Sequence, residues 1–157
     1  MRTRSLVISM TLVSAYVLAL AVIAVAADNP FVGTWKMNPA KSNGTNYKSY
    51  TIKVESRDNG FSAVQDIVNT EGKVIHATQT AKYDGKDYPL KGSPDADMMS
   101  FTKPGPNTVD YIVKKNGKEV QRGQAFISQD GKIWTDKGGG KDANEQAFTY
   151  TIIMEKQ

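Results

Sequence analysis

The sequence predicts an all-β protein, an antiparallel up-and-down meander that closes into a barrel of eight to ten strands. Turn-forming Asn-Gly and Asp-Gly pairs recur at short intervals from Asn43-Gly44 to Asp130-Gly131, and such pairs suit tight hairpins. Between them, apolar and polar residues alternate with a period of two, as in Tyr50-Thr51-Ile52-Lys53-Val54. No stretch of the predicted domain has a helical period with capping residues. A meander with one buried face must close or stack, and closure removes its edges.

An apolar segment precedes the first expected strand. Arg2 and Arg4 are followed by an almost wholly apolar run from Leu6 to Val25 and then by small residues. This order is typical of a signal peptide. We therefore expect residues 1–27 to be an export signal and residues 28–157 to form one barrel domain, periplasmic or secreted, with no stable membrane insertion after cleavage. The apolar run is about 20 residues long, so an uncleaved membrane anchor is the alternative.

Removing the signal lowers the positive charge of the chain. The sequence has 20 Lys and Arg against 16 Asp and Glu, but Arg2 and Arg4 leave with the signal, so 18 basic residues remain. These are scattered among acids and form no basic run with interleaved aromatic residues, which predicts no nucleic-acid partner. The chain has no cysteine, and this excludes thiol nucleophiles, thiolate zinc sites and disulfides.

Each expected strand lies between two turn or loop signals. The clearest alternation occurs in 48–56, 108–115 and 147–155. The glycine-rich run 138–144 is expected to be a flexible loop before the last strand, and 91–97 is expected to be another loop. In order, the strands are expected at 31–37, 48–56, 61–69, 74–83, 86–90, 98–103, 108–115, 119–128, 132–137 and 147–155.

One face of the best-patterned strands is apolar and is expected to point inward. Barrels of this size either fill their interior with side chains or keep a cavity. Three of the inward residues are tyrosines, whose hydroxyls need partners when buried; this mix favours a cavity. The expected inward set is Tyr50, Ile52, Val54, Val109, Tyr111, Val113, Phe148, Tyr150 and Ile152.

Several runs resemble a known group of barrels. Gly33-Thr34-Trp35, within Phe31–Lys36, resembles the opening strand of the calycin group, which comprises lipocalins and fatty-acid-binding proteins. The run Tyr150–Lys156 is similar to the closing strand of fatty-acid-binding proteins. The runs 33–42, 83–89 and 92–97 look like those of small exported bacterial lipocalin-like proteins. The resemblance covers most of residues 28–157 and implies a lipocalin-like barrel.

The resemblance also implies roles for particular residues. Trp35 would plug one end of the barrel, and Gly33 would let the backbone pass close to a neighbour, so both are expected to be structural. Lys156 is the candidate for the basic residue that lipocalins place over this tryptophan. Segment 38–47 is too short for the helix pair of fatty-acid-binding proteins.

Arg122 is the candidate for binding an acidic ligand. It shares a strand face with Phe126, and if this face points inward, the guanidinium would need an anion such as a ligand carboxylate. If Gln121, Gly123 and Ala125 point inward instead, Arg122 lies in water, and the pattern allows both. The predicted ligand-binding residues are Arg122, Tyr50, Ile52, Tyr111, Phe126 and Tyr150.

The sequence contains no spaced catalytic set. His76 is the only histidine, and no Gly-x-Ser-x-Gly elbow accompanies it. We therefore predict no catalytic residues, no metal, no cofactor and no enzymatic activity, and we expect a small, mostly apolar or acidic ligand inside the barrel. The alternative is a filled barrel that acts as an interaction module through loops 38–47, 91–97 and 138–146. A carboxylate-based hydrolase is a third, less favoured hypothesis.

Overall fold

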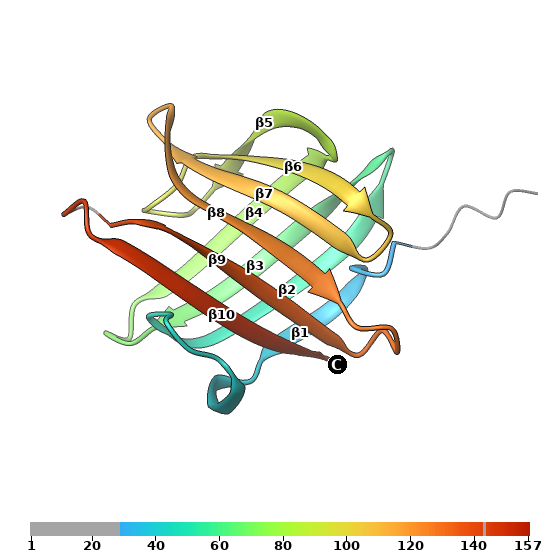
Figure 1. Cartoon of the computed structure of the whole chain (residues 1–157), viewed down its shortest axis with the longest axis horizontal. Coiled ribbons are helices and arrows are strands. Elements are labelled where there is room, and N and C mark those ends of the chain that lie inside the picture. Colours follow the sequence, from blue (N-terminus) through green and yellow to red (C-terminus); the bar gives the residue numbers. More distant parts are fainter. Residues whose placement is uncertain (1–28, 143) are drawn as a thin grey trace, which may run out of the picture.

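The computed structural model describes residues 29–142 and 144–157, which form a closed antiparallel barrel (Figure 1). Consecutive strands are neighbours, and β1 pairs with β10 to close the barrel. The predicted all-β meander is thus confirmed, whereas the predicted signal at 1–27 lies outside the described residues. The strands are β1 (Gly33–Met37), β2 (Tyr47–Arg57), β3 (Gly60–Asn69), β4 (Val74–Lys82), β5 (Asp84–Lys91), β6 (Met98–Gly105), β7 (Thr108–Lys115), β8 (Lys118–Ile127), β9 (Ile133–Lys141) and β10 (Ala147–Lys156).

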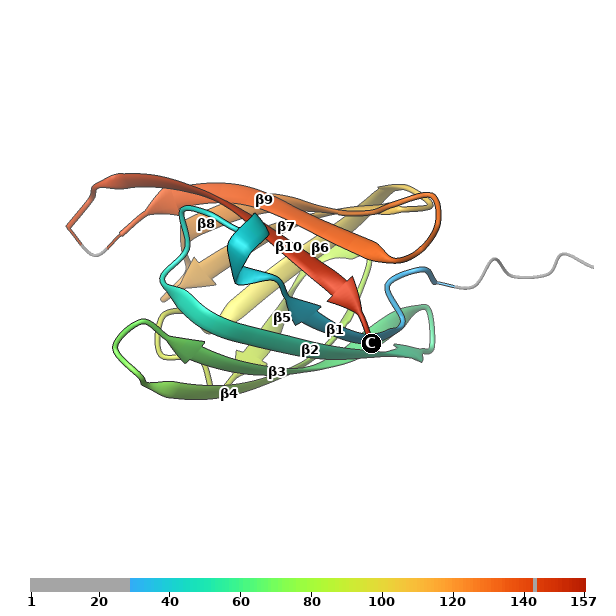
Figure 2. The ribbon, with the colours of Figure 1, turned by 90° about the horizontal axis from the view of Figure 1, so that it is seen from below.

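The up-and-down order gives the barrel two distinct ends. The β1–β2, β5–β6 and β9–β10 connections lie at one end, which we call the open end. The β1–β2 connection carries the short 3-10 helix η1 (Pro39–Lys41), which is seen beside β10 in Figure 2. Among the described residues, no helix has the length and apolar character needed to cross a membrane.

The other end of the barrel is filled by a group that we call the plug: Trp35, Ile127 and Met154. These are the largest fully buried side chains among the described residues. The Trp35 indole Nε1 donates a hydrogen bond to the Phe31 backbone oxygen at 2.9 Å. Its ring meets that of Trp134 edge to face, with centroids 5.6 Å apart. This end of the barrel is therefore a packed core.

Gly33 and Lys156 complete the plug from the outside. The Lys156 ammonium Nζ lies 5.2 Å from the Trp35 ring centroid, which is within cation–π range. Gly33 has a φ of +133°, and a Cβ there would come 2.9 Å from Cε of Lys156. Glycine at this position permits both the backbone conformation and the close approach of the lysine stem. The neighbour that the backbone approaches here is the side chain of Lys156.

The glycine run that was expected to be a loop is part of a strand. β9 continues through Gly138, Gly139 and Gly140 to Lys141 and pairs with both β8 and β10 along this stretch. The physical reason is aromatic packing over the bare backbone: the ring of Tyr150 lies against Gly138, where any Cβ would collide with its hydroxyl. Gly139 and Gly140 instead lie against the backbones of β10 and β8, so the run marks a close approach to one ring and to neighbouring backbone.

Replacing Trp35 by Ala should destabilise the protein strongly, because it leaves a large cavity in the plug. We expect a loss of about 3–5 kcal/mol in the free energy of unfolding, measured by urea denaturation. The matched control is Phe126→Ala on β8, where the ring is 45% exposed, and this change should cost less than about 1 kcal/mol. Equal losses at the two positions would contradict the assignment of Trp35 to the plug.

Candidate functional site

A cavity of about 780 Å³ occupies the barrel between the plug and the open end. Phe31 and Trp134 line its floor, while the plug residue Trp35 lies behind them and does not touch it. The Trp134 indole Nε1 is a buried donor without an acceptor among the described residues. The volume is in the range of small-molecule sites, which are about 300–1,000 Å³.

The wall of the cavity is mostly apolar. Inward positions of β2, β3, β4, β7, β8 and β10 contribute aliphatic and aromatic side chains, several of them small enough to leave space. Ala63, Ala77 and Ala125 are the small ones, and each is at most 3% exposed. Such a wall accommodates an apolar body and repels a free charge.

A polar cluster stands on this apolar wall. It consists of Asp136 on β9, Tyr111 on β7, Tyr150 on β10 and Gln121 on β8. The Tyr111 hydroxyl donates to Oδ1 of Asp136 at 2.5 Å and also contacts the Tyr150 hydroxyl. The Gln121 amide Nε2 donates to the Tyr150 hydroxyl at 2.7 Å. Four strands thus converge on one hydrogen-bonded network inside the barrel.

Burial changes the acidity of this cluster. Desolvation raises the pKa of Asp136 from 3.8 to about 7, and the hydrogen bond from Tyr111 counters only part of this effect. Burial also raises the pKa of Tyr111 and of Tyr150, and the nearby Asp136 adds to both shifts. The part of Asp136 that remains accessible faces the cavity. Near neutral pH the interior therefore holds a carboxyl group that gains and loses its proton.

Charged residues of both signs line the cavity at the open end. Lys115 donates from Nζ to the Pro94 backbone oxygen at 2.9 Å. Lys141 pairs with Glu145, with 3.2 Å between Nζ and Oε2. Two carboxylates, Asp95 and Asp142, line the same opening. These four residues form what we call the rim of the cavity. The rim carries both positive and negative charges, and both of its lysines already have partners.

Four predicted site residues line the cavity. Tyr50, Ile52, Tyr111 and Tyr150 are each at most 8% exposed and point into the barrel. The Tyr50 hydroxyl donates to Oε1 of Gln65 at 3.0 Å, which supplies the partner that a buried tyrosine needs. Their contact with a ligand stays a prediction.

The other two predicted residues lie outside, so the interpretation that Arg122 and Phe126 face the interior is wrong. Arg122 forms a two-point ion pair with Glu119 on the outer face, with Nε–Oε1 and Nη2–Oε2 distances of 2.6 and 2.7 Å. Its side chain is 68% exposed. The alternation of β8 instead points Gln121 and Ala125 inward. The guanidinium stays hydrated, which avoids the cost of burying it.

The prediction from the sequence did not include the central residue of the cluster. Asp136 follows Trp134 by two positions, so a strand that buries Trp134 also turns Asp136 inward. That period-two relation was the available signal. It was obscured because the expected strand 132–137 ended one residue later, in front of the three glycines.

The barrel wall is thin between β4 and β5. Only Thr78–Lys91 and Gln79–Leu90 pair there, whereas β3 and β4 pair along nine positions. The Leu90 N–H donates to the Asp97 oxygen on the β6 side, so the nitrogen of residue 89 faces β4. Residue 89 is proline and has no N–H to donate, which ends the ladder.

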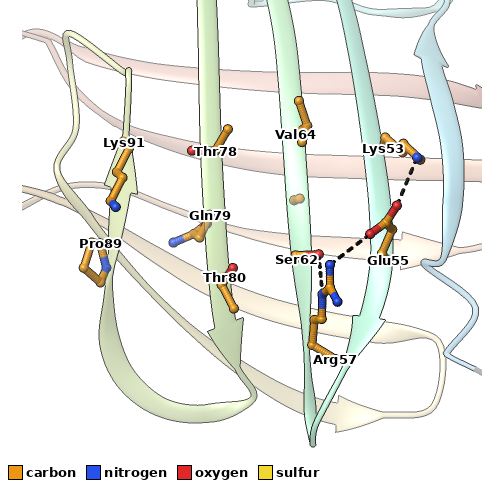
Figure 3. Close-up of a pocket in the computed structure, with 11 residues that line it drawn as sticks. Lys53, Glu55, Arg57, Ser62, Val64, Thr78, Gln79, Thr80, Pro89 and Lys91 are labelled. Carbon is orange, nitrogen blue, oxygen red and sulfur yellow. Dashed lines mark hydrogen bonds and ion pairs between the residues drawn. The ribbon is translucent and has the colours of Figure 1, made fainter.

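An outer groove of about 480 Å³ crosses this gap (Figure 3). Gln79 and Ala63 line both the groove and the inner cavity. The Gln79 side chain reaches toward β5 and donates from Nε2 to the Tyr88 oxygen at 3.4 Å. One glutamine side chain thus stands between the interior and the groove.

The remaining chemical candidates lie away from the cavity. His76 pairs with Asp66 on the outer face, at 2.7 Å between Nδ1 and Oδ1, and both side chains are 62% exposed. Asp84 accepts a hydrogen bond from the Tyr88 hydroxyl at 3.0 Å within the β5 segment. Within residues 29–142 and 144–157, no group of three or more His, Asp or Glu side chains is placed to hold a metal ion.

Burial of Asp136 makes stability depend on pH in an unusual direction. Its folded-state pKa is raised, so the folded protein holds the proton more tightly than the unfolded chain, and this stabilisation is lost as pH rises from about 4 to about 7. The full effect is at most about 4 kcal/mol, at about 1.4 kcal/mol per pH unit. Urea denaturation of Asp136→Asn and the parent over this pH range should show the difference. Parallel curves would contradict the buried carboxyl.

The comparisons with known proteins bear on the fold. No family model matches this chain, and no curated protein matches it. It is similar to the crystal structure of zebrafish ileal bile acid-binding protein complexed with cholic acid, with a TM-score of 0.53 and 11% identity. The match covers 82% of this chain and 99% of that one. This likeness shows the fold alone, and with the closed ten-stranded meander it confirms that the protein has a calycin-like barrel.

Proposed function

We propose that the protein binds a small, mostly apolar ligand inside its barrel, as an exported, non-enzymatic binding protein. The observation that carries this proposal is the cavity of about 780 Å³ above the plug. A cavity with an apolar wall and a few convergent polar groups is the usual form of a small-molecule site. The wall would bury the apolar body of the ligand, and the polar cluster would orient its head.

The similar zebrafish protein was solved with cholic acid, an observation that belongs to that protein. By analogy at the level of the fold, it supports an amphiphilic ligand for this chain. Export is proposed from the signal-like residues 1–27, which precede the barrel in sequence. The alternative from the sequence is a filled barrel that acts through its loops. It is less well supported, because the barrel holds a cavity and the loop residues Thr45, Ser93 and Asp142 line it.

Two routes connect such a ligand with solvent. One is the open end, where the loop residues border the cavity. The other is the gap between β4 and β5, where Gln79 separates the cavity from the outer groove. The backbone ladder between β4 and β5 is confined to two register pairs, and beyond them the hydrogen bond from Gln79 to Tyr88 is the side-chain contact that holds the gap closed.

Filling the cavity should abolish binding. In Ala125→Phe, an inward ring on β8 would occupy space beside Asp136, the residue opposite in register. We expect at least about a tenfold loss of affinity for a neutral dye such as N-phenylnaphthylamine, measured by fluorescence titration, since a ring replaces buried ligand contacts.

The matched control is Gln124→Phe, which places the same ring on the outer face one residue earlier. This variant should bind the dye like the parent. Ala77→Leu, a smaller addition on β4, provides a second cavity-filling variant. Unchanged dye affinity in both inward variants, with a native circular dichroism spectrum, would overturn binding inside the barrel.

A further inference from the structure

The charge inside the barrel has the wrong sign for an acidic head group. Among the residues that the structure describes, Asp136 is the carboxyl that lines the middle of the cavity, and the cation expected there, Arg122, lies on the outer face. Within the described residues, the basic side chains that line the cavity are Lys115 and Lys141, both at the rim. An anion placed deep in this cavity would meet a carboxyl group with no buried cation beside it.

We propose that the ligand is an apolar amine whose protonated nitrogen binds against Asp136. This inference rests on the proposed function, because it specifies the chemistry of the ligand in the same cavity. The head group would be an ammonium, which supplies up to three hydrogen-bond donors. The body would be aliphatic or aromatic and would lie against the apolar wall.

The carboxyl group has room for such a partner. Oδ1 of Asp136 accepts the hydrogen bond from Tyr111. None of the hydrogen bonds formed by the described residues uses Oδ2, and Asp136 lines the cavity. A carboxylate has about four lone-pair sites, so one tyrosine leaves most of its accepting capacity unused. An ammonium at this oxygen would form a charge-assisted hydrogen bond away from bulk water.

Tyrosine rings surround the same space. Tyr47 and Tyr50 on β2 meet edge to face with centroids 5.8 Å apart, and both line the cavity with Tyr111 and Tyr150. The negative charge of Asp136 contributes to the raised pKa of all four hydroxyls, which places the four rings within its electrostatic reach. Electron-rich ring faces attract cations, so these rings favour the same head group as the carboxylate does.

The charged groups around Asp136 determine how binding should respond to pH. Tyr111, Tyr150, Tyr50 and Tyr47 face it from β7, β10 and β2, and burial raises the pKa of each above its ordinary value, so they stay neutral below pH 10. The ionisable residues at the rim are Lys115, Lys141, Asp95 and Asp142. Burial brings the pKa of Asp136 to about 7, so the charge of this carboxyl changes over the physiological range.

Two ligands of opposite charge should therefore show opposite pH dependence. Burial raises the pKa of Asp136 to about 7. An ammonium binds its ionised form, so amine affinity should rise about tenfold per pH unit up to about pH 7 and then level off. A ligand carboxylate binds when Asp136 is protonated, so the affinity for an acidic ligand should fall about tenfold per pH unit above pH 7.

The test uses three probes that have alkyl chains of the same length and differ in their head groups: dodecylamine, dodecanol and dodecanoic acid. Each displaces N-phenylnaphthylamine from the whole protein between pH 5 and pH 9. At pH 8 we expect the amine to bind at least about tenfold more tightly than the acid, a ratio typical of one charge-assisted hydrogen bond.

Asp136→Asn isolates the carboxyl with little change of shape. It should reduce amine affinity at pH 8 at least about tenfold more than it reduces dodecanol affinity, and it should remove the pH dependence. The matched control is Asp110→Asn on the outer face of β7, where the carboxylate accepts a hydrogen bond from Gln124. This control should leave all three affinities unchanged. The pH series on the parent protein tests the proposal even if Asp136→Asn does not fold.

The outcomes separate the two proposals. If dodecanol or dodecanoic acid binds but the amine has no advantage, or if Asp136→Asn keeps full amine affinity, the amine inference is overturned and interior binding stands. Acid binding that persists above pH 8 would assign the head group to the lysines at the rim and would likewise overturn the inference. If none of the three probes displaces the dye, both proposals fail.

Discussion

Closure of the barrel by β1 and β10 is the constraint on which the rest of the structure depends. Only three register pairs join these strands, and one of them places Trp35 opposite Lys156. Because the first and last strands meet there, the indole is packed from inside by Trp134 and covered from outside by the lysine. The plug fills that end, and the cavity occupies the barrel between the plug and the open end.

The buried carboxyl is the feature that fold stability alone does not explain. Desolvation of Asp136 is unfavourable once the group ionises, and an apolar residue at this position would avoid that cost. The tyrosine network satisfies the carboxyl only in part, and the remaining oxygen faces the cavity. A destabilising polar group inside an otherwise apolar wall is typical of a site kept for binding.

Local pattern was sufficient for much of the fold but not for the chemistry of the site. Alternation and Asn-Gly turns predicted the strands, and Tyr50, Tyr111 and Tyr150 point inward as expected. The face of β8 was undecided, because Arg122 and Gln121 both stand among mixed neighbours. β9 was cut short, because glycines have no hydrophobic pattern of their own and are held here by one ring and by the backbones of neighbouring strands. The inward face of β8 and the length of β9 both depend on contacts between residues that are far apart in the sequence.

A crystal structure of the protein with dodecylamine bound tests the account most directly. The account predicts the ammonium nitrogen within hydrogen-bond distance of the Asp136 carboxylate, with the alkyl chain among the apolar side chains between Trp134 and the open end. An alkyl chain in the outer groove between β4 and β5 would contradict it. So would a chain inside the barrel with its nitrogen at the rim, away from Asp136.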